Sequence, residues 1–281
     1  MKLISGKEIS QEIKENLKNK IEKENLKPGL AIIMVGNNPA SEVYVRNKLK
    51  ACEYIHVDAH LYSFNEDAKE AEIIDCIMDL NANKNIHGII VQSPLPVGFN
   101  EDYITSFIRP DKDVDGFGTY SLGAIASNKE ELIAATPLGI IKILEHEDIP
   151  IEGSHVVMVG RSKIVGRPLA LALLNRNATV TIAHSKTKNL KEITKKADIV
   201  VVAIGKPNYL TKDYIKEGAI VIDVGINRTS DGKLVGDVDF ASVREKASYL
   251  TPVPGGVGPM TVAMLLNNTV LSAEKFNQER N

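Results

Sequence analysis

The chain has 281 residues, which at ~150 residues per domain predicts about two domains, each long enough to bury a core. Its 34 Lys and Arg residues nearly balance its 36 Asp and Glu residues, so the formal net charge of −2 supplies no field for holding a polyanion such as DNA. With 43% hydrophobic residues and 20 glycines the composition is that of an ordinary folded protein, which excludes an intrinsically disordered chain.

Cysteine usage and the N-terminal segment indicate the compartment. Cys52 and Cys76 lie in predicted helices and form neither a CxxC pair nor a Cys/His cluster, so we expect reduced thiols and no bound metal. The N-terminal segment carries charges at Lys2, Lys7 and Glu8, and no later run reaches the ~18 apolar residues of a membrane span. The sequence therefore predicts a cytoplasmic protein that binds neither membrane nor nucleic acid.

Short apolar runs alternate with longer amphipathic stretches in the first half of the chain. Residues 30–35, 57–64 and 88–91 are predicted strands, and residues 39–55 and 66–81 are the helices between them. The strand segments lack regular polar alternation, as is typical of strands covered on both faces. This pattern predicts an α/β domain with a mostly parallel sheet and helices on each side.

A second series of the same kind follows a loop rich in Pro, Gly and Asp at residues 109–123. A helix begins near Pro137, and further strands and helices are predicted at residues 156–159, 167–175, 179–183, 190–196, 199–204 and 220–224. We therefore expect a substrate domain at residues 1–136 and a Rossmann-like domain at residues 137–258. The C-terminal helix, residues 259–281, is predicted to return to the first domain.

In the second domain an apolar strand runs directly into a glycine turn that opens a helix, HVVMVGRSKIVGRPLALALL. Gly160 and Gly166 allow close approach of the backbone, and the N–H groups at the helix start favour an anion, so we expect a phosphate there. The spacing, with Ser162 in the middle, differs from the dinucleotide pattern GxGxxG. A tight turn that needs glycine for a positive φ is the alternative interpretation.

The residues after the next strand favour NADP over NAD. That strand leads into His184-Ser185-Lys186-Thr187, where NAD-binding proteins place an Asp or Glu about 20 residues past the glycine turn. Ser185 and nearby cations, among them Arg161 from the turn, would instead donate to a 2′-phosphate, which a carboxylate would repel.

Two further strands of this domain lead into glycines, Gly205 and Gly225. At the carboxyl edge of an open sheet, such glycines let the backbone approach a cofactor. A P-loop is excluded because Gly205-Lys206 is followed by Pro207 instead of Ser or Thr.

A tyrosine and a lysine share one face of a predicted helix in the first domain. Asn37-Asn38-Pro39 is a favourable helix start, and Tyr44 and Lys48 then stand at positions i and i+4. Such a pair can stack on a planar ligand and move a proton, because burial lowers the pKa of a lysine amine. A solvated basic face is the alternative, since Arg46, Lys48 and Lys50 alternate with apolar residues. The Tyr-xxx-Lys pair of short-chain dehydrogenases follows their glycine turn, whereas this pair precedes it, which disfavours that family.

Three loops offer further ligand contacts. Gln92 follows the strand at 88–91 beside a Pro-rich turn, so its amide either binds a ligand or satisfies loop backbone groups. The run DKDVDG at 111–116 resembles the start of a calcium loop, but Leu122 stands where that loop needs Glu. It is either a solvated turn or a segment in which Asp115 anchors the N–H groups of a ligand. Residues 251–261 contain three prolines and three glycines, so they form a shaped loop that walls a ligand or makes a rigid turn.

Taken together, these segments resemble the bifunctional methylenetetrahydrofolate dehydrogenase/methenyltetrahydrofolate cyclohydrolase family. They occur in family order: VGNNPASEVYVRNK, GIIVQSPLP, KDVDGF, VGRSKIVGRP, AHSKT, ADIVVVAIGKP, IDVGIN, GDVDF and TPVPGGVGPMT. The resemblance implies two α/β domains, an N-terminal folate-binding domain and a Rossmann-like NADP-binding domain, with the active-site cleft between them. It also implies a homodimer and a role in one-carbon metabolism and purine biosynthesis.

The resemblance assigns roles by position. In that family Lys48 would be the acid–base lysine of the cyclohydrolase step, Gln92 would tune it, and Tyr44 would stack on the folate. Asp115 would hold the pterin, so these four residues are both catalytic and substrate-binding. The NADP contacts would be Gly160, Arg161, Ser162, Ser185 and Ile226, and the loop against the substrate would be Val253, Pro254, Gly255 and Gly256. Where the family commonly has Gly, after the helix that carries Lys48, this chain has His56.

The expected function is oxidation of 5,10-methylenetetrahydrofolate with NADP and hydrolysis of the methenyl product to 10-formyltetrahydrofolate. Two other hypotheses stay open. A shikimate-type NADP dehydrogenase also pairs an α/β substrate domain with a Rossmann-like one, but its alcohol substrate would not call for the Pro-Gly loop. A nucleotide-sensing regulatory protein is favoured only if cofactor binds and no folate is turned over.

Overall fold

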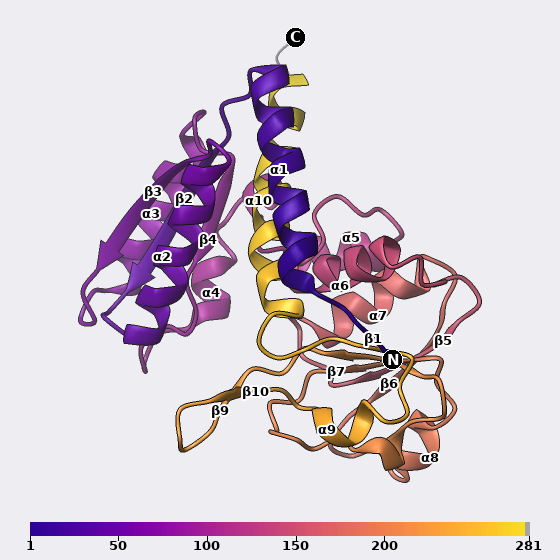
Figure 1. The fold of residues 1–281 in the computed structure, drawn as a ribbon. Helices are drawn as coiled ribbons and strands as arrows, with labels where there is room; N and C mark the ends of the chain where they lie inside the picture. The colour runs from indigo at the N-terminus through magenta and orange to yellow at the C-terminus, as the bar shows by residue number, and fades with distance from the viewer. Residues whose placement is uncertain (279–281) are drawn as a thin grey trace. The chain divides into compact units, whose positions relative to one another are not determined.

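The computed structural model describes residues 1–278, so the last three positions of the helix predicted at 259–281 lie outside the described residues. The chain divides into two compact units (Figure 1). Unit 1 comprises Met1–Gln11, Ile125–Glu130 and Thr136–Thr261. Unit 2 comprises Glu12–Ala124, Glu131–Ala135 and the chain from Val262 onward.

Unit 2 is built on a three-stranded parallel sheet in the order β3-β2-β4, with β3 at Asp58–Phe64, β2 at Gly29–Val35 and β4 at Gly88–Val91. Figure 1 shows helix α2 (Pro39–Tyr54) in front of this sheet and α3 (Glu70–Ala82) behind it. The chain therefore crosses from strand to parallel strand through a helix each time, as the alternating pattern predicts.

Burial in the sheet of unit 2 follows strand position. The central strand β2 is buried almost throughout, and its residues Ala31 and Ile33 pack with Ile73 and Ile77 of α3 and with Ile89 of β4. The expectation that every strand is covered on both faces is wrong for β3, where Leu61 is 42% exposed. β3 is an edge strand with one neighbour, so an apolar run there does not imply burial.

Further helices lie wholly or partly in unit 2. Their bounds are α1 Gly6–Glu24, α4 Glu101–Thr105, the 3₁₀ turn η1 Pro110–Lys112, α5 Thr119–Ala126 and α10 Val257–Gln278. Within unit 2, Asn268 of α10 is buried and donates its amide Nδ2 to the carbonyl oxygens of Val114 and Ile133, both at 2.9 Å. These bonds join the C-terminal helix to the segment that follows η1.

Unit 1 contains a six-stranded parallel sheet in the order β1-β11-β8-β7-β5-β6. The strands are β1 Lys2–Leu3, β5 His155–Val159, β6 Thr179–Ala183, β7 Ile199–Val202, β8 Ile220–Asp223 and β11 Tyr249–Leu250, with a separate antiparallel pair of β9 Asn227–Arg228 and β10 Leu234–Val235. The helices are α6 Ala135–His146, α7 Gly166–Leu174, α8 Leu190–Thr194, η2 Lys212–Tyr214 and α9 Phe240–Val243. Figure 1 shows α6 and α7 on one face of the sheet and α8 and α9 on the other.

The strand order of unit 1 creates a switch point beside β5. The chain passes from β5 to β6 on one side and then returns to place β7 on the other side. Val159 at the end of β5 is in register with Ala183 of β6 and Val202 of β7, so the three carboxyl ends meet at one edge. In open α/β sheets, ligands bind in the crevice outside such a point.

The turn after α2 is formed without glycine. His56 has a φ of +65°, in the left-handed region that favours glycine, and the N–H of Val57 donates to the carbonyl of Cys52 at 2.9 Å. The imidazole Nε2 lies 3.3 Å from Glu22. The turn therefore forms with histidine at the position where the resemblance implies glycine, at the cost of backbone strain.

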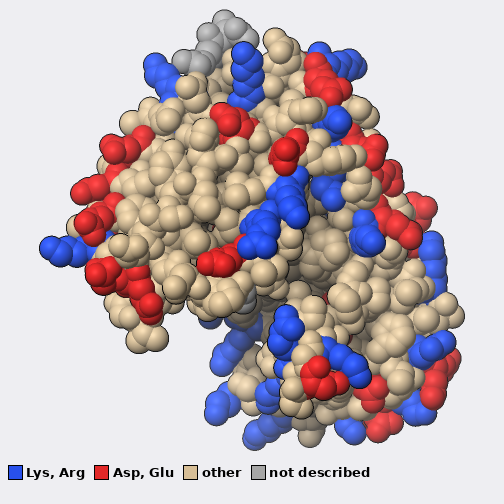
Figure 2. All heavy atoms as spheres, turned by 60° about the vertical axis from the view of Figure 1, so that its left-hand side comes forward, with Lys and Arg blue, Asp and Glu red and all other residues tan. Residues whose placement is uncertain are grey.

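Charge and hydropathy on the surface agree with the composition. Figure 2 shows acidic and basic side chains interspersed on the face in view. Within residues 1–278, each helix is too short or too polar to cross a lipid bilayer.

Candidate active site

Lys48 and Gln92 meet in unit 2 at the carboxyl end of β4. The Lys48 amine donates to Gln92 Oε1 at 3.1 Å. Gln92 Nε2 donates to the carbonyl of Ser93 at 2.6 Å, and its backbone N–H donates to Ile33 at 2.8 Å. Because the amide nitrogen is held by the neighbouring carbonyl, the amide oxygen is the end turned toward the lysine.

The start of α2 sets the position of Lys48. The helix begins at Pro39, and Asn38 Oδ1 accepts from the N–H of Ser41 at 3.3 Å, as a helix cap does. Tyr44 stands one turn before Lys48 on the same face and is 48% exposed, whereas Lys48 is partly buried. An exposed aromatic ring next to a half-buried amine offers a flat ligand both a stacking surface and a proton donor.

Asp115 completes this group from the segment after η1. Its carboxyl is partly buried, and burial raises its pKa to about 6, which the Lys48 ammonium opposes. The carboxylates of Asp113 and Glu101 raise that pKa further. Lys48, Gln92 and Asp115 thus come together from one helix, one strand end and one loop, and the first two of them lie 44 residues apart in sequence.

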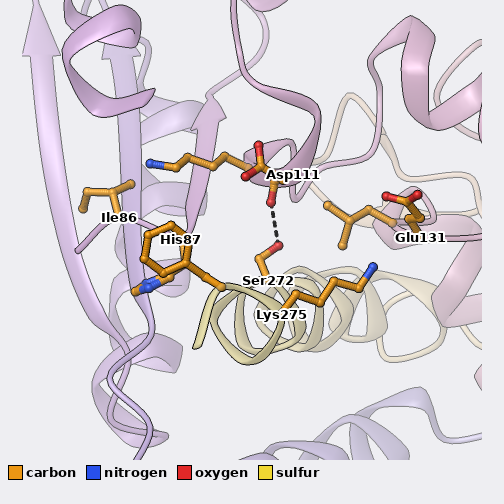
Figure 3. A pocket seen from close by; sticks show the side chains of 9 residues that line it. Ile86, His87, Asp111, Glu131, Ser272 and Lys275 are labelled. Atoms are coloured by element: carbon orange, nitrogen blue, oxygen red, sulfur yellow. Dashed lines mark hydrogen bonds between the residues drawn. The ribbon is translucent and has the colours of Figure 1, made fainter. Parts of the chain in front are cut away.

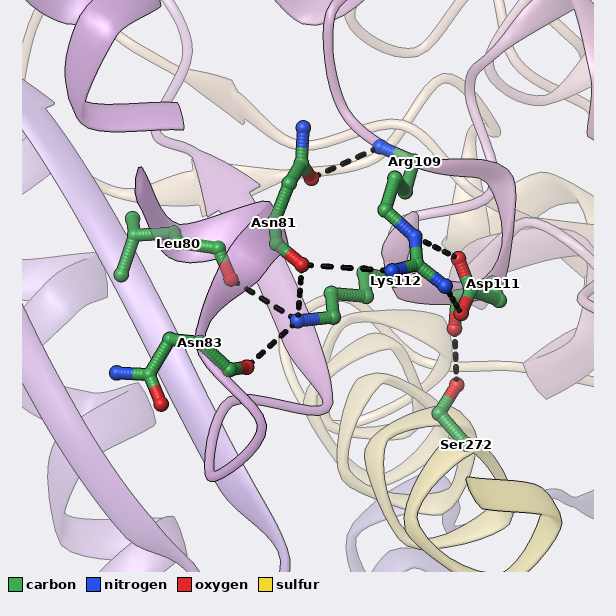
Figure 4. Close-up of polar contacts among 7 residues, drawn as sticks. All are labelled: Leu80, Asn81, Asn83, Arg109, Asp111, Lys112 and Ser272. Carbon is green, nitrogen blue, oxygen red and sulfur yellow. Dashed lines mark hydrogen bonds and ion pairs between the residues drawn. The ribbon is translucent and has the colours of Figure 1, made fainter. Parts of the chain in front are cut away.

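The segment that carries Asp115 is anchored by a buried lysine (Figure 4). Lys112 is 3% exposed, and its amine donates to the carbonyl oxygens of Leu80, Asn81 and Asn83 at 2.9, 2.9 and 2.8 Å. These carbonyls end α3 and have no partner within the helix, so Lys112 caps it. Burial lowers the pKa of Lys112 to about 8, and the three acceptors favour the charged amine.

Asn81 and Arg109 extend this network toward the surface. Asn81 Oδ1 accepts from the backbone N–H of Arg109 at 3.0 Å, and Asn81 Nδ2 donates to Phe107 at 2.7 Å. Arg109 pairs with Asp111 at 2.7 Å in an exposed ion pair. Ser272 of α10 donates its hydroxyl to the Asp111 carbonyl at 2.9 Å (Figure 4).

A second buried carboxylate fixes the chain on the other side of Asp115. Asp113 accepts from the N–H of Gly116 at 3.1 Å, from that of Gly118 at 2.8 Å and from the Ser121 hydroxyl at 3.4 Å. Burial raises the pKa of Asp113, and these donors oppose the rise. The hypothesis of a solvated turn is therefore wrong for Lys112 and Asp113. Sequence reasoning missed both residues. A lysine between two carboxylates looks the same in sequence whether it is solvated or, as here, bonded to the backbone carbonyls of a distant helix end.

A hollow of about 90 Å³ lies in unit 2 away from this group (Figure 3). Its lining consists of Ile86, His87, Asp111, Lys112, Glu131, Leu132, Ser272, Lys275 and Phe276. Its buried polar groups are already satisfied: the Lys112 amine caps α3, and His87 Nδ1 accepts from the N–H of Gly29 at 3.0 Å. Lys48, Gln92 and Asp115 are not among the residues that line it.

The glycine turn of unit 1 stands at the switch point. Gly160 has a φ of +132°, and its N–H donates to Ala183 at 2.8 Å. A Cβ on Gly160 would collide with the carbonyl oxygen of Ala203, and one on Gly166 would lie 2.5 Å from the carbonyl oxygen of Gly160. Only glycine fits at these two positions, and the tight backbone leaves the sheet edge open to a dinucleotide.

Ser162 caps the helix that follows the turn. Its hydroxyl oxygen accepts from the N–H groups of Val165 at 3.1 Å and Gly166 at 3.3 Å, and its carbonyl accepts from Arg167 at 3.0 Å. The expectation that free N–H groups at this helix start hold a phosphate is therefore wrong for these three groups. An anion at this edge would have to be bound by other donors. The exposed side chain of Arg161, the residue before Ser162, is one candidate.

The residues after β6 form a closed turn. The N–H of His184 donates to Thr187 Oγ1 at 2.8 Å, and the N–H of Lys186 donates to His184 Nδ1 at 3.2 Å. Ser185 and Lys186 are left exposed at the tip. Because β6 pairs with β5, this turn stands next to Gly160 at the carboxyl edge of the sheet.

The remaining predicted contacts also belong to unit 1. Ile226, in the loop after β8, is 47% exposed. The Val253–Pro254 peptide is cis, and the Gly255 carbonyl accepts from the N–H of Lys7 at 3.0 Å. A Cβ on Gly256 would lie 2.5 Å from the carbonyl oxygen of Pro252. Residues 253–256 are thus a tightly folded loop after β11.

Known proteins share both parts of this architecture. The family model described as tetrahydrofolate dehydrogenase/cyclohydrolase, catalytic domain, matches residues 4–115, and the model of the NAD(P)-binding domain of the same family matches residues 134–277. The chain is 53% identical over 277 residues to the bifunctional protein FolD of Nitrosospira multiformis, covering 98% of this chain and 96% of that protein.

Solved structures agree with these matches. The FolD methylenetetrahydrofolate dehydrogenase/cyclohydrolase of Campylobacter jejuni is 48% identical with a TM-score of 0.96, over 98% of this chain and 99% of that one. The Trypanosoma brucei enzyme, solved with NADP cofactor and inhibitor, is 33% identical with a TM-score of 0.93, over 98% and 97% of the two chains.

Proposed function

Because the chain belongs to the tetrahydrofolate dehydrogenase/cyclohydrolase family, we propose that it is a bifunctional enzyme of one-carbon folate chemistry. It oxidises 5,10-methylenetetrahydrofolate to 5,10-methenyltetrahydrofolate with NADP and hydrolyses that product to 10-formyltetrahydrofolate. The observation that carries the proposal is the Lys48 amine held by Gln92 beside Asp115. The bifunctional protein FolD of Nitrosospira multiformis, which matches this chain over nearly its full length, supports the two activities.

The oxidation needs positioning more than acid–base help. The one-carbon unit of the substrate lies between two nitrogens, whose lone pairs stabilise the cation left when hydride departs. When bound, NADP supplies the nicotinamide that accepts the hydride. The chain's part is to hold the folate by its planar ring and its polar edge, for which we assign Tyr44 and Asp115. Residues 253–256 form a further wall for the substrate.

The hydrolysis needs a proton to move. Water adds to the methenyl carbon, and a ring nitrogen leaves as it gains a proton, which is work for a positioned amine. We assign this proton transfer to Lys48. The Gln92 oxygen orients the Lys48 amine by accepting its hydrogen bond. The Asp115 carboxylate accepts hydrogen bonds from N–H groups of the pterin, and its negative charge attracts the Lys48 ammonium.

We assign the NADP site to the switch point of unit 1. The close backbone at Gly160 fits a dinucleotide, and Ser162 fixes the turn from which Arg161 projects. Ser185 and Arg161 donate to the 2′-phosphate, where an acidic residue would have selected NAD. Ile226 offers an apolar surface to the cofactor. The complex of the Trypanosoma brucei relative with NADP supports NADP as the cofactor.

The finer organisation follows the same proposal. We assign residues 1–136 with the C-terminal helix, described from residue 259 to residue 278, to the folate-binding catalytic domain, and residues 137–258 to the NADP-binding domain. Residues 1–11 lie in unit 1, where β1 pairs with β11. The enzyme works as a homodimer in the cytoplasm, in keeping with its two free thiols, Cys52 and Cys76. Its 10-formyl product is a formyl donor of the kind that purine biosynthesis consumes.

One assay tests both activities. Purified protein is mixed with 5,10-methylenetetrahydrofolate and either NADP or NAD, reduced nicotinamide is followed, and methenyl and 10-formyl products are quantified. We expect faster reduction with NADP and accumulation of the 10-formyl product. Reduction that stops at the methenyl product would remove the hydrolytic role of Lys48, and no reduction with either cofactor would overturn the proposal.

A further inference from the structure

Two buried carboxylates lie behind the loops at the carboxyl edge of unit 1. Asp223 ends β8 and is 3% exposed, and Asp237 follows β10 and is fully buried. Within residues 1–278 neither carboxylate forms an ion pair with a lysine, arginine or histidine. Burying a carboxyl group costs free energy unless its oxygens accept hydrogen bonds. The donors that surround each carboxylate therefore indicate its structural role.

Asp237 gathers the loop after β7 and joins it to the loop after β8. Its Oδ2 accepts from the N–H groups of Ile204 at 2.6 Å and Gly205 at 3.0 Å, and its Oδ1 accepts from the N–H of Lys206 at 2.8 Å. Oδ1 also accepts from Asn227 Nδ2 at 2.9 Å. Three consecutive N–H groups turned toward one point form an anion-binding nest, and here a carboxylate of the chain itself fills it.

Asp223 in turn holds Asp237 in place. Its Oδ1 accepts from the N–H of Gly225 at 3.0 Å and from that of Asp237 at 2.9 Å, while its Oδ2 accepts from Val238 at 3.0 Å. A Cβ on Gly225 would run into the Asp237 carboxylate, and one on Gly236 would run into that of Asp223. Because the glycines of the segments IDVGIN and GDVDF have no side chain, they leave room for the two carboxylates.

We infer that Asp237, held by Asp223, is a positioning residue for the dinucleotide, an inference that rests on the proposed function. It fixes the spacing between the loop after β7 and the loop that carries Ile226, which together with the Gly160 turn make the carboxyl edge of the sheet. It also keeps the nest of residues 204–206 occupied, so that the phosphates of the cofactor are directed to the β5 and β6 side.

The substitution Asp237→Asn tests this inference. The amide keeps the shape of the carboxylate but places its own N–H₂ against N–H donors, so the two loops lose their common anchor. We expect the KM for NADP to rise about tenfold or more, a change of roughly 1.4 kcal/mol in binding. Hydrolysis of methenyltetrahydrofolate measured without NADP should keep its wild-type rate, because Lys48, Gln92 and Asp115 belong to unit 2.

Two further variants make the result decisive. Asp239 caps α9, because its Oδ1 accepts from the N–H of Ser242 at 3.2 Å. The variant Asp239→Ala removes this cap and so destabilises the same unit without changing a contact of either loop. It should leave the KM for NADP unchanged. If Asp237→Asn does not fold, Asn227→Ala removes a single donor and should raise the KM for NADP by a smaller factor.

Each outcome is assigned in advance. An Asp237→Asn protein that folds and keeps the wild-type KM for NADP overturns the inference, as does an equal loss of both activities or an equal effect of Asp239→Ala. If Asn227→Ala is used instead, an unchanged KM for NADP also overturns the inference. A wild-type protein that reduces neither NADP nor NAD is a different failure, because it removes the proposed function itself.

Discussion

The buried amine of Lys112 gives the sharpest test of how unit 2 supports its site. In the variant Lys112→Met, an apolar side chain of similar length replaces the amine, and three carbonyl oxygens at the end of α3 lose a charged donor. The Asn81 carbonyl keeps a longer contact with Arg109 Nη1 at 3.5 Å, and the Asn83 carbonyl keeps the N–H of Ile86 at 3.3 Å. Hydrogen bonds to a charged group are worth ~1.5–3 kcal/mol each, but relief from burying the charge offsets a large part of their sum. We expect a net loss of about 3 kcal/mol in the free energy of unfolding.

Thermal unfolding followed by circular dichroism measures this loss. For a protein of this size, 1 kcal/mol lowers Tm by about 2–4 °C, so Lys112→Met should melt about 6–12 °C lower. Because Asp115 follows Lys112 by one short segment, cyclohydrolase activity should fall while the affinity for NADP is kept.

The matched control is Asp111→Asn, next along the chain. It removes an ion pair whose side chains are about half exposed, 51% and 50%, and such pairs contribute little. The backbone carbonyl that accepts from Ser272 stays in place. A Lys112→Met protein that melts with the wild type and hydrolyses methenyltetrahydrofolate normally would refute the reasoning, as would an equal effect of Asp111→Asn.

Four other changes give separate readouts. Lys48→Ala should abolish cyclohydrolase activity in a product assay while hydride transfer persists, and near-normal hydrolysis would refute its role. The pKa of Asp115, raised to about 6, predicts that the KM for folate rises as pH falls through 6, because protonation removes the acceptor, and that Asp115→Asn loses this pH dependence. The raised pKa also means that the folded state holds the Asp115 proton more tightly than the unfolded state does. The free energy of unfolding should therefore fall as pH rises from about 4 to about 6, and urea titrations of the wild type and Asp115→Asn at several pH values would show the difference. Arg161→Ala combined with Ser185→Ala should weaken NADP far more than NAD in steady-state kinetics, and equal losses would contradict recognition of the 2′-phosphate. His56→Gly should relieve left-handed strain and raise the free energy of unfolding by about 1 kcal/mol in a urea titration, whereas a loss of stability would mean that the contact with Glu22 outweighs the strain.

The sequence pattern was sufficient for the layers of the fold and for the sheet edges to which we assign the ligand contacts. Apolar runs and helical periodicity predict β2, β4 and α2, and the rule that parallel strands share a carboxyl edge places Gln92 and Gly160 at strand ends. The exposure of β3 was not predictable in this way, because an edge strand and a central strand can carry the same apolar residues.

Residue spacing in the sequence does not predict the hydrogen bonds that support the site. Whether Lys112 is solvated or buried depends on the end of α3, about thirty residues earlier in the chain, which no local pattern encodes. Ser162 shows the same limit, since a serine in a glycine turn reads equally well as a phosphate contact or as a helix cap. The roles of the site residues toward folate and NADP stay predictions until ligands are bound.

The division of contacts between the two units has a consequence for how such an enzyme changes over evolutionary time. The anchors of Lys48, Gln92 and Asp115 lie inside unit 2, whereas those of Gly160, Ser162 and Asp237 lie inside unit 1. A mutation that erodes one set leaves the scaffold of the other intact. Within the unit 2 set, Lys48 and Gln92 are assigned to hydrolysis alone, whereas Asp115 also holds the folate for the oxidation. A lineage can therefore lose hydrolysis through substitutions at Lys48 or Gln92 while it keeps hydride transfer, without redesign of the fold.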